Sequence, residues 1–307
     1  MLKNRIAVIL VVASSLAVTS CGGESDLTAA GGTIESGALA TVLAGTAFTD
    51  FKTSITPSGT GGLSIPVSGL PTGTGTLVAL APTGFEACTT TSGSATDGAD
   101  ADRVRAFYRQ DLNCTDLVFH GGTNTFTGYY QEKDYDETKY GWAGGFLYDF
   151  DMTYKSVYSH ETNEGRWKGL WSVVNTGTTI TTIGEWFSEG GSTPTATPAQ
   201  KSVWRSTNKS STVLTPTNMA TPWQAGSTVI NGYFGVTGVI YNSTTSTSYG
   251  LDVVFKIESQ NLTYDRTTCT TGHYKDGTLS FTDGGGNVLK YTWVSCTETR
   301  TFNGTTI

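Results

Sequence analysis

The chain has 307 residues and a formal net charge of −7, with 26 acidic residues against 19 basic ones. This balance argues against binding to nucleic acid, because contacts with phosphates need clustered lysine and arginine side chains. Charged residues make up only 15% of the chain, whereas glycine contributes 38 residues. A composition rich in glycine, serine and threonine is typical of many exported β proteins.

The first twenty residues have the pattern of a targeting segment. Lys3 and Arg5 precede an apolar run over residues 6–18, which is short for a membrane span and has no stop-transfer sequence after it. Residues 18–21, Val-Thr-Ser-Cys, resemble the lipobox of bacterial lipoproteins, in which a branched apolar residue and two small residues precede a cysteine. The alternative is an ordinary secretory signal followed by an unrelated cysteine.

The lipobox resemblance implies that Cys21 carries a lipid anchor. In that family the cysteine thiol receives a diacylglycerol group, the chain is cleaved before the cysteine, and the new amino terminus is acylated, for example with palmitate. Acyl chains contribute about 0.8 kcal/mol per buried CH₂ group, so two or three of them hold a protein at a membrane without a transmembrane helix. Gly22, rather than an aspartate, follows the cysteine, which favours the outer membrane of the bacterial cell envelope over the inner one.

Four cysteines remain after Cys21, namely Cys88, Cys114, Cys269 and Cys296. An even number of cysteines in an oxidising compartment predicts disulfide bonds, and four cysteines allow three different pairings. We expect Cys88–Cys114 and Cys269–Cys296, because each pair closes a loop within one local part of the chain.

Prolines indicate the organisation of the mature chain, because a proline cannot donate a hydrogen bond inside a sheet. All eight lie within residues 57–82 or 194–222, which leaves two proline-free blocks as candidates for β-sheet. The predicted organisation is a signal peptide over 1–20, a Gly/Ser/Thr-rich tether over 21–74, a first β block over 75–190, a Pro/Thr-rich linker or loop over 191–226 and a second β block over 227–307. In the alternative organisation, residues 75–307 form one domain.

Both blocks show the two-residue alternation of strands that are buried on one face. Residues 140–154 place mainly aromatic side chains at even positions, with Asp149 and Asp151 at odd ones, and residues 250–258 alternate in a similar way. Residues 277–296 predict a hairpin with its turn at 283–286. No convincing helical period follows the signal. The sequence therefore predicts an all-β, antiparallel fold, arranged as a large sandwich or barrel.

Seven tryptophans raise the question of a sugar-binding surface, since flat aromatic rings pack against the apolar faces of sugars. Most of them lie on the apolar side of an alternating strand, where packing in a sheet core is the simpler interpretation. Trp204 and Trp223 lie in or beside the predicted linker and are the better candidates for exposed ligand contacts.

An acidic cluster precedes the aromatic strand of the first block. Its members are Glu132, Asp134, Asp136 and Glu137. They bind a cation or line a ligand groove in one interpretation, and belong to a solvated loop in the other, which is the more common case for such a cluster.

A second acidic cluster is a candidate metal site. Asp97, Asp100 and Asp102 lie beside a glycine-containing turn, and flexible loops that offer several oxygen ligands bind calcium. The spacing lacks the pattern of a calcium-binding EF-hand loop. Ca²⁺ is the only cofactor that the sequence indicates.

Three functions are open at this point. The first is a lipid-anchored binding or surface-structural module, whose partner besides the membrane is a glycan or a protein of the envelope or of another surface. The second is a polysaccharide hydrolase, for which Asp149, Asp151, Glu185 and Glu189 could supply the required pair of carboxylates. The third is an outer-membrane β-barrel, whose lipid-facing surface also suits aromatic strands. The first is favoured because the sequence contains no catalytic motif, and no catalytic residue is assigned.

Overall fold

The computed structural model describes residues 30–34, 36–45, 85–94, 105–119, 121–139, 144–198, 202–242, 247–270 and 274–307. Cys21 and the candidate calcium ligands Asp97, Asp100 and Asp102 lie outside these residues. The elements are α1 (Gly37–Gly45), the 3₁₀ helix η2 (Phe85–Cys88), β1 (Thr89–Gly93), β2 (Tyr108–Phe119), β3 (Gly122–Asp134), β4 (Phe146–Val157), β5 (Glu161–Asn175), β6 (Ile180–Pro194), β7 (Ser202–Pro216), β8 (Ala225–Asn242), β9 (Thr247–Asp265), β10 (Tyr274–Thr282), β11 (Val288–Val294), β12 (Thr297–Phe302) and β13 (Thr305–Thr306).

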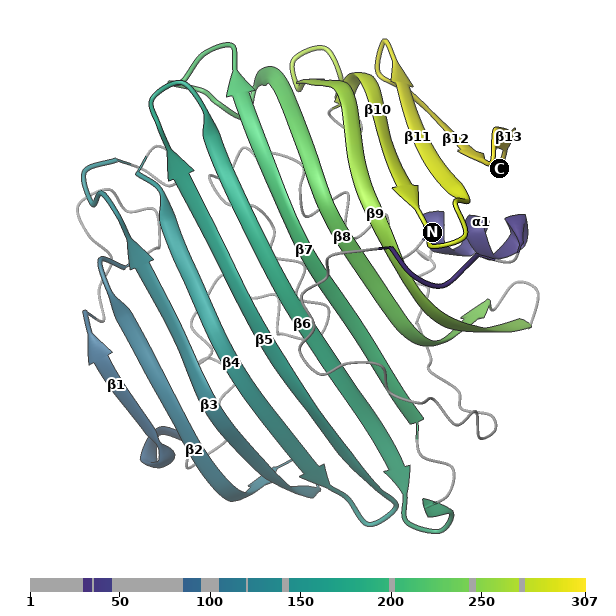
Figure 1. Ribbon diagram of the computed structural model, residues 1–307. Helices are drawn as coiled ribbons and strands as arrows, with labels where there is room; N and C mark the ends of the chain where they lie inside the picture. Colours follow the sequence, from purple (N-terminus) through teal and green to yellow (C-terminus); the bar gives the residue numbers. More distant parts are fainter. Residues whose placement is uncertain are drawn as a thin grey trace, which may run out of the picture.

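The described strands form one sheet of 13 strands in which each strand pairs with the next one along the chain. Every pairing is antiparallel, and Figure 1 shows the strands following one another across the sheet in sequence order. This order arises because consecutive antiparallel strands can be joined by short connections. The all-β, antiparallel fold predicted from the sequence is confirmed.

One face of the sheet carries the hydrophobic core. In β9, Phe255 and Ile257 are completely buried, whereas Lys256 between them is exposed on the other face. The core continues through Leu289 and Tyr291 of β11. A fully buried side chain of this size contributes roughly 1.5–3 kcal/mol relative to an exposed one. We call this face the inner face and the opposite one the outer face.

Glycines on the inner face accommodate aromatic rings from the neighbouring strand. A methyl group at Gly169 would lie 2.5 Å from the Phe150 ring, and one at Gly184 would lie 3.2 Å from the Trp171 ring. Gly169 is directly opposite Phe150, and Gly184 is directly opposite Trp171. Each ring therefore lies over a position that has no side chain, which fixes the pairing of β4, β5 and β6.

The structure has a strand where the sequence indicated a linker over 191–226. β7 occupies the middle of this range and pairs along its length with β6 and β8. Of the four prolines in this range, Pro194 closes β6 and Pro216 closes β7, and the other two, Pro198 and Pro222, lie in connections between strands. The serine- and threonine-rich sequence of β7 resembles a loop in composition. The two proline-free blocks are thus halves of one continuous sheet.

The range predicted as a tether, 21–74, contains a docked segment. Gly31 forms a β-bridge with Val254, and the backbone N–H of Ile34 donates to Asp283 Oδ2 at 2.6 Å. Helix α1 then packs its Leu39 and Leu43 side chains into the core, beside the C-terminal strands in Figure 1. The helix was not predicted, because nine residues of glycine, alanine and other small or apolar types contain no polar face to define a period.

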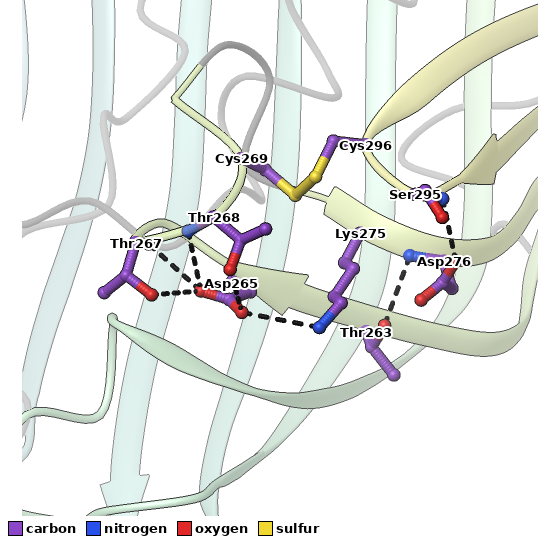
Figure 2. A network of polar contacts seen from close by, with 9 residues as sticks. All are labelled: Thr263, Asp265, Thr267, Thr268, Cys269, Lys275, Asp276, Ser295 and Cys296. Carbon is purple, nitrogen blue, oxygen red and sulfur yellow. Dashed lines mark hydrogen bonds and ion pairs between the residues drawn. A yellow bond between two sulfur atoms is a disulfide. The ribbon is translucent and has the colours of Figure 1, made fainter.

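Both predicted disulfides are confirmed. Cys88 and Cys114 join η2 to β2, and Cys269 and Cys296 join the connection after β9 to the turn between β11 and β12. Figure 2 shows the polar contacts beside the second bond. Asp265 accepts hydrogen bonds from the Thr267 and Thr268 hydroxyls and lies 3.6 Å from Lys275 Nζ.

We predict that Asp283→Ala lowers the free energy of unfolding by about 1–3 kcal/mol, the usual cost of leaving a buried donor unsatisfied. Asp283 is 2% exposed, and besides Ile34 it accepts from the backbone and side-chain N–H groups of Asn287. Denaturant unfolding measures the change. Asp252→Ala is the matched control, because Asp252 is exposed and accepts from the Thr237 hydroxyl. Equal losses in both variants would contradict a special role for Asp283.

Candidate functional site

A shallow groove with a volume of about 500 Å³ crosses one end of strands β3–β7. This volume lies within the range of small-molecule binding sites. Its lining combines hydroxyl groups, charges of both signs and three glycines. The lining residues are Thr125, Thr153, Tyr154, Lys155, Glu164, Gly165, Arg166, Glu189, Gly190, Gly191 and Val203.

Strand register brings the charged side chains of the groove together on the outer face. Lys155 of β4 is directly opposite Glu164 of β5, and Arg166 is directly opposite Glu189 of β6. Glu164 is also directly opposite Gly191 of β6. A larger residue at position 191 would project a side chain between Glu164 and β7. Because glycine has no side chain, the backbone of β6 forms the floor of the groove here.

The floor is supported from the inner face by an aromatic pair. A methyl group at Gly165 would lie 2.5 Å from the Tyr154 ring, so this ring covers the glycine closely. The Tyr154 ring also stacks on Trp167, with 4.6 Å between ring centroids and 20° between the planes. Because two rings in contact resist displacement, the backbone of β4 and β5 is held in place beneath the groove.

Two ion pairs orient the charges at the groove. Arg166 donates to both carboxylate oxygens of Asp151, at 2.9 and 2.6 Å, and Arg205 donates to Glu189 at 3.0 Å. The hydrogen bond from Arg166 lowers the pKa of Asp151 below its ordinary value, although partial burial opposes this effect. Bidentate pairing of this kind fixes the plane of the Arg166 guanidinium group.

The four acids considered for a hydrolase all lie on the outer face, and each has a partner. Besides the two pairs just described, Asp149 accepts from the Tyr129 hydroxyl at 3.2 Å. Glu185 lies 3.7 Å from Lys209 Nζ. Of the four, Glu189 alone is among the residues that line the groove, where the second carboxylate is Glu164.

The predicted acidic cluster begins on the buried face of β3 and ends in the turn after this strand. Glu132 and Asp134 are only 4% and 5% exposed, so neither belongs to a solvated loop. Glu132 lies 3.1 Å from Arg105 Nε and accepts a 2.7 Å hydrogen bond from the Tyr130 hydroxyl. Burial, followed by the nearby Glu132 carboxylate, raises the pKa of Tyr130 above its ordinary value. These contacts connect the segment before β2 to the end of β3.

The remaining candidates lie in the turn after β3 and far from it. Asp136 and Glu137 are half-buried beside Asp134, which accepts the backbone N–H of Asp136 at 2.7 Å. Trp223 is half-buried in the connection between β7 and β8, and Trp204 lies in β7. Strands β4–β6 separate β3 from β7, so the tryptophans and the acidic cluster do not form a single site.

The residues that build the groove were mostly missed from the sequence. Lys155, Glu164 and Arg166 lie at polar positions of alternating strands, which identifies their face but gives no reason to single them out. Gly190 and Gly191 lie at the boundary between the predicted first β block and the predicted linker or loop, where no site was expected. Only the register between β4, β5 and β6 shows that these residues meet, and register is not visible in one sequence without known turns.

Two further types of site were sought in the described part of the chain. It contains no group of three or more histidine, cysteine, aspartate or glutamate side chains that could hold a metal ion. No helix there combines the length and the apolar character that a membrane span requires.

Comparisons with known proteins give no match. The chain matches no protein-family model, no curated protein and no solved structure. Its function therefore has to be inferred from its own residues.

We predict that the Asp136 carboxyl titrates with a pKa of about 2. The main cause is the contact from Lys139 Nζ at 2.6 Å, and the Thr138 hydroxyl and backbone N–H add to it. A lowered pKa stabilises the folded turn above the unfolded value near 4, and this contribution is lost as the pH falls towards 2. Carboxyl NMR titration should show the pKa rising in Lys139→Met and unchanged in the distant Lys155→Met. An unchanged pKa in Lys139→Met would contradict the assignment.

Proposed function

We propose that this protein is a lipid-anchored lipoprotein of the bacterial cell envelope that binds a polar ligand, a glycan or a protein surface, in the groove across β3–β7. The observation that carries this proposal is the glycine floor of the groove between charged and hydroxyl-bearing walls. Sugars and polar peptides both offer the hydrogen-bonding groups that such walls bind.

The arrangement of the groove favours binding of a ligand over a purely structural role. Among its lining residues, Arg166 is already oriented by Asp151 and Glu189 by Arg205, so little ordering of these side chains is required when a ligand binds. Preorganised polar groups of this kind favour affinity, because the entropy of fixing them is lost on folding and not on binding. The outer face also carries charges on several adjacent strands, which suits contact with water and with polar partners.

The envelope location is supported by two independent features. Cys21 is preceded by a sequence that resembles a lipobox, and the two disulfides need an oxidising compartment to persist. A lipid anchor at Cys21 would hold the protein at the membrane, with the outer membrane favoured.

A polysaccharide hydrolase is the second candidate, and one observation favours it. Glu164 and Glu189 both line the groove and are diagonal neighbours on β5 and β6, a relationship that places residues roughly 7–8 Å apart. This is close to the separation of the two carboxylates in glycoside hydrolases. Binding remains the first proposal because Glu189 accepts from Arg205 and no described tryptophan lines the groove.

We predict that Gly191→Val weakens binding of glycans or envelope proteins at least tenfold, because the new side chain fills the groove floor. The Gly191 backbone is not in the left-handed region, and valine is favoured in strands. Screening on a glycan array and on envelope extracts, followed by calorimetry, measures the effect. Gly250→Val is the control, since Gly250 is an exposed strand glycine on β9 with open space around it. Equal weakening by both variants would refute the groove as the site.

We also predict that metabolic labelling with a fatty acid marks the wild-type protein and is lost in Cys21→Ser. The serine hydroxyl does not replace the thiol that the lipobox resemblance assigns to diacylation. Electrophoresis of the labelled protein from membrane fractions gives the readout. Label that persists in Cys21→Ser would overturn the lipoprotein assignment without affecting the groove.

A further inference from the structure

The two edges of the described sheet differ in how well they are protected from other strands. At one edge, β13 is only two residues long, and β12 beside it carries Glu298 and Arg300. Short edge strands and charged side chains are common means by which a sheet avoids pairing with another chain. At the other edge, β1 has the sequence Thr-Thr-Thr-Ser-Gly, with no charge and no proline, and its pairing with β2 is regular. β1 therefore lacks these protective features.

β1 is open to solvent on both of its faces. Residues 90–93 are all exposed, although successive strand residues point to opposite faces. A strand covered by packing on one face would have a buried residue at every second position. Within the described part of the chain, β1 pairs with β2 alone, and Figure 1 shows it as the outermost strand of the sheet. Its free edge is thus accessible to a further strand.

The backbone of Thr91 is directed towards this free edge. Ser94 donates its backbone N–H to the carbonyl oxygen of Phe107 at 2.8 Å, and hydrogen-bonded positions recur at every second residue of an antiparallel pair. Residues 90 and 92 therefore exchange backbone hydrogen bonds with β2. The N–H and C=O groups of Thr91, which lies between them, point to the opposite side, where a further strand would bond to them.

A disulfide holds this exposed strand in place. Cys88 directly precedes β1 and is bonded to Cys114 of β2, which is completely buried. The bond fixes the start of a strand that is not covered by core packing, and the Ser94 hydrogen bond fixes its end. Strand addition obtains its affinity from main-chain hydrogen bonds. A template strand that is already ordered favours such pairing, because less conformational entropy remains to be lost.

We propose that β1 pairs antiparallel with β1 of a second copy of this chain, around a twofold axis at Thr91. The two Thr91 residues then face each other and exchange backbone hydrogen bonds, and Thr90 faces Ser92 of the second copy. Hydroxyl-bearing pairs of this kind are favourable in sheets, and these residues carry no charges that would repel each other. The assembly closes as a dimer, because a twofold interface uses the same edge of both copies and the other edge is protected.

The dimer would combine a small interface with two grooves on one face. Pairing of a single short strand buries less than the roughly 1,200 Å² of a stable interface, so association is weak in dilute solution. Opposite residues of paired strands share a face, so the outer faces of both copies are continuous and their grooves face the same way. The lipid anchor proposed at Cys21 would confine the copies to one surface and raise their effective concentration.

Sedimentation velocity of the full-length protein in detergent, at rising concentration, tests the pairing. Thr91→Pro removes the N–H donor on each side of the axis, whereas β2 makes no bond with this group. Since proline is tolerated at edge positions of this kind, we expect self-association at least tenfold weaker than in wild type and little change in Tm. Thr91→Val is the matched control, because it keeps the N–H, and it should associate as wild type does.

A charge exchange identifies the second strand. Thr91→Lys and Thr91→Glu each place like charges opposite each other across the axis, so each variant alone should associate several-fold more weakly than wild type. An equimolar mixture of the two should recover dimers, because a lysine then faces a glutamate.

Three results would overturn the proposal. Wild type that stays monomeric at every concentration would exclude self-pairing. Dimers that Thr91→Pro leaves unchanged would assign the contact to another surface. Weakening by both charged variants without recovery in their mixture would exclude a twofold axis at Thr91. None of these results depends on a ligand of the groove, so they leave the proposed function to its own test.

Discussion

The environment of the side chains in the described sheet depends on the register between neighbouring strands. Because side chains alternate between the two faces, a shift of one residue would move Phe255 and Ile257 from the core to water and bring Lys256 inside. The glycines opposite aromatic rings oppose such a shift, since Phe150 fits over Gly169 and not over a neighbour with a side chain. The register that pairs the strands is thus the same register that buries the core.

The same register divides polar chemistry between the two faces. On the outer face, charges meet in pairs such as Asp151 with Arg166 and Glu189 with Arg205, and the groove lies among them. On the inner face, the polar side chains of Thr182 and Ser188 are uncharged and buried, and Ser188 is directly opposite Trp167. A ligand of the kind proposed for the groove would therefore meet oriented charges, whereas the inner face is closed by packing.

The sequence was sufficient for features that depend on local pattern. Alternation predicted the antiparallel β fold, and the short chain distance within each pair predicted the disulfides Cys88–Cys114 and Cys269–Cys296. The sequence was insufficient where the composition of a segment suggests a different structure from the one that it adopts in the fold. β7 is polar enough to resemble a linker, and α1 is too short and too uniformly apolar to show a period.

The candidate site was harder to predict than the fold because it is assembled across strands. Glu132 and Asp134 attracted attention as neighbours in sequence, yet pairing buries them with Arg105 and Tyr130. Glu164 and Gly191 are far apart in sequence and meet only through the pairing of β5 with β6. A single sequence shows which face a residue lies on, but not which residues of other strands lie beside it.

The docked segment before α1 has a mechanical consequence. Cys21 precedes Gly31 by ten residues, so in a chain attached to a membrane at Cys21, the first described contacts to bear a pull from the anchor are the Gly31–Val254 bridge and the Ile34–Asp283 hydrogen bond. That load enters the sheet at β9 and at the turn between β10 and β11, close to strands that Cys269–Cys296 locks together. The groove lies on β3–β7, away from the strand and the turn that hold the docked segment.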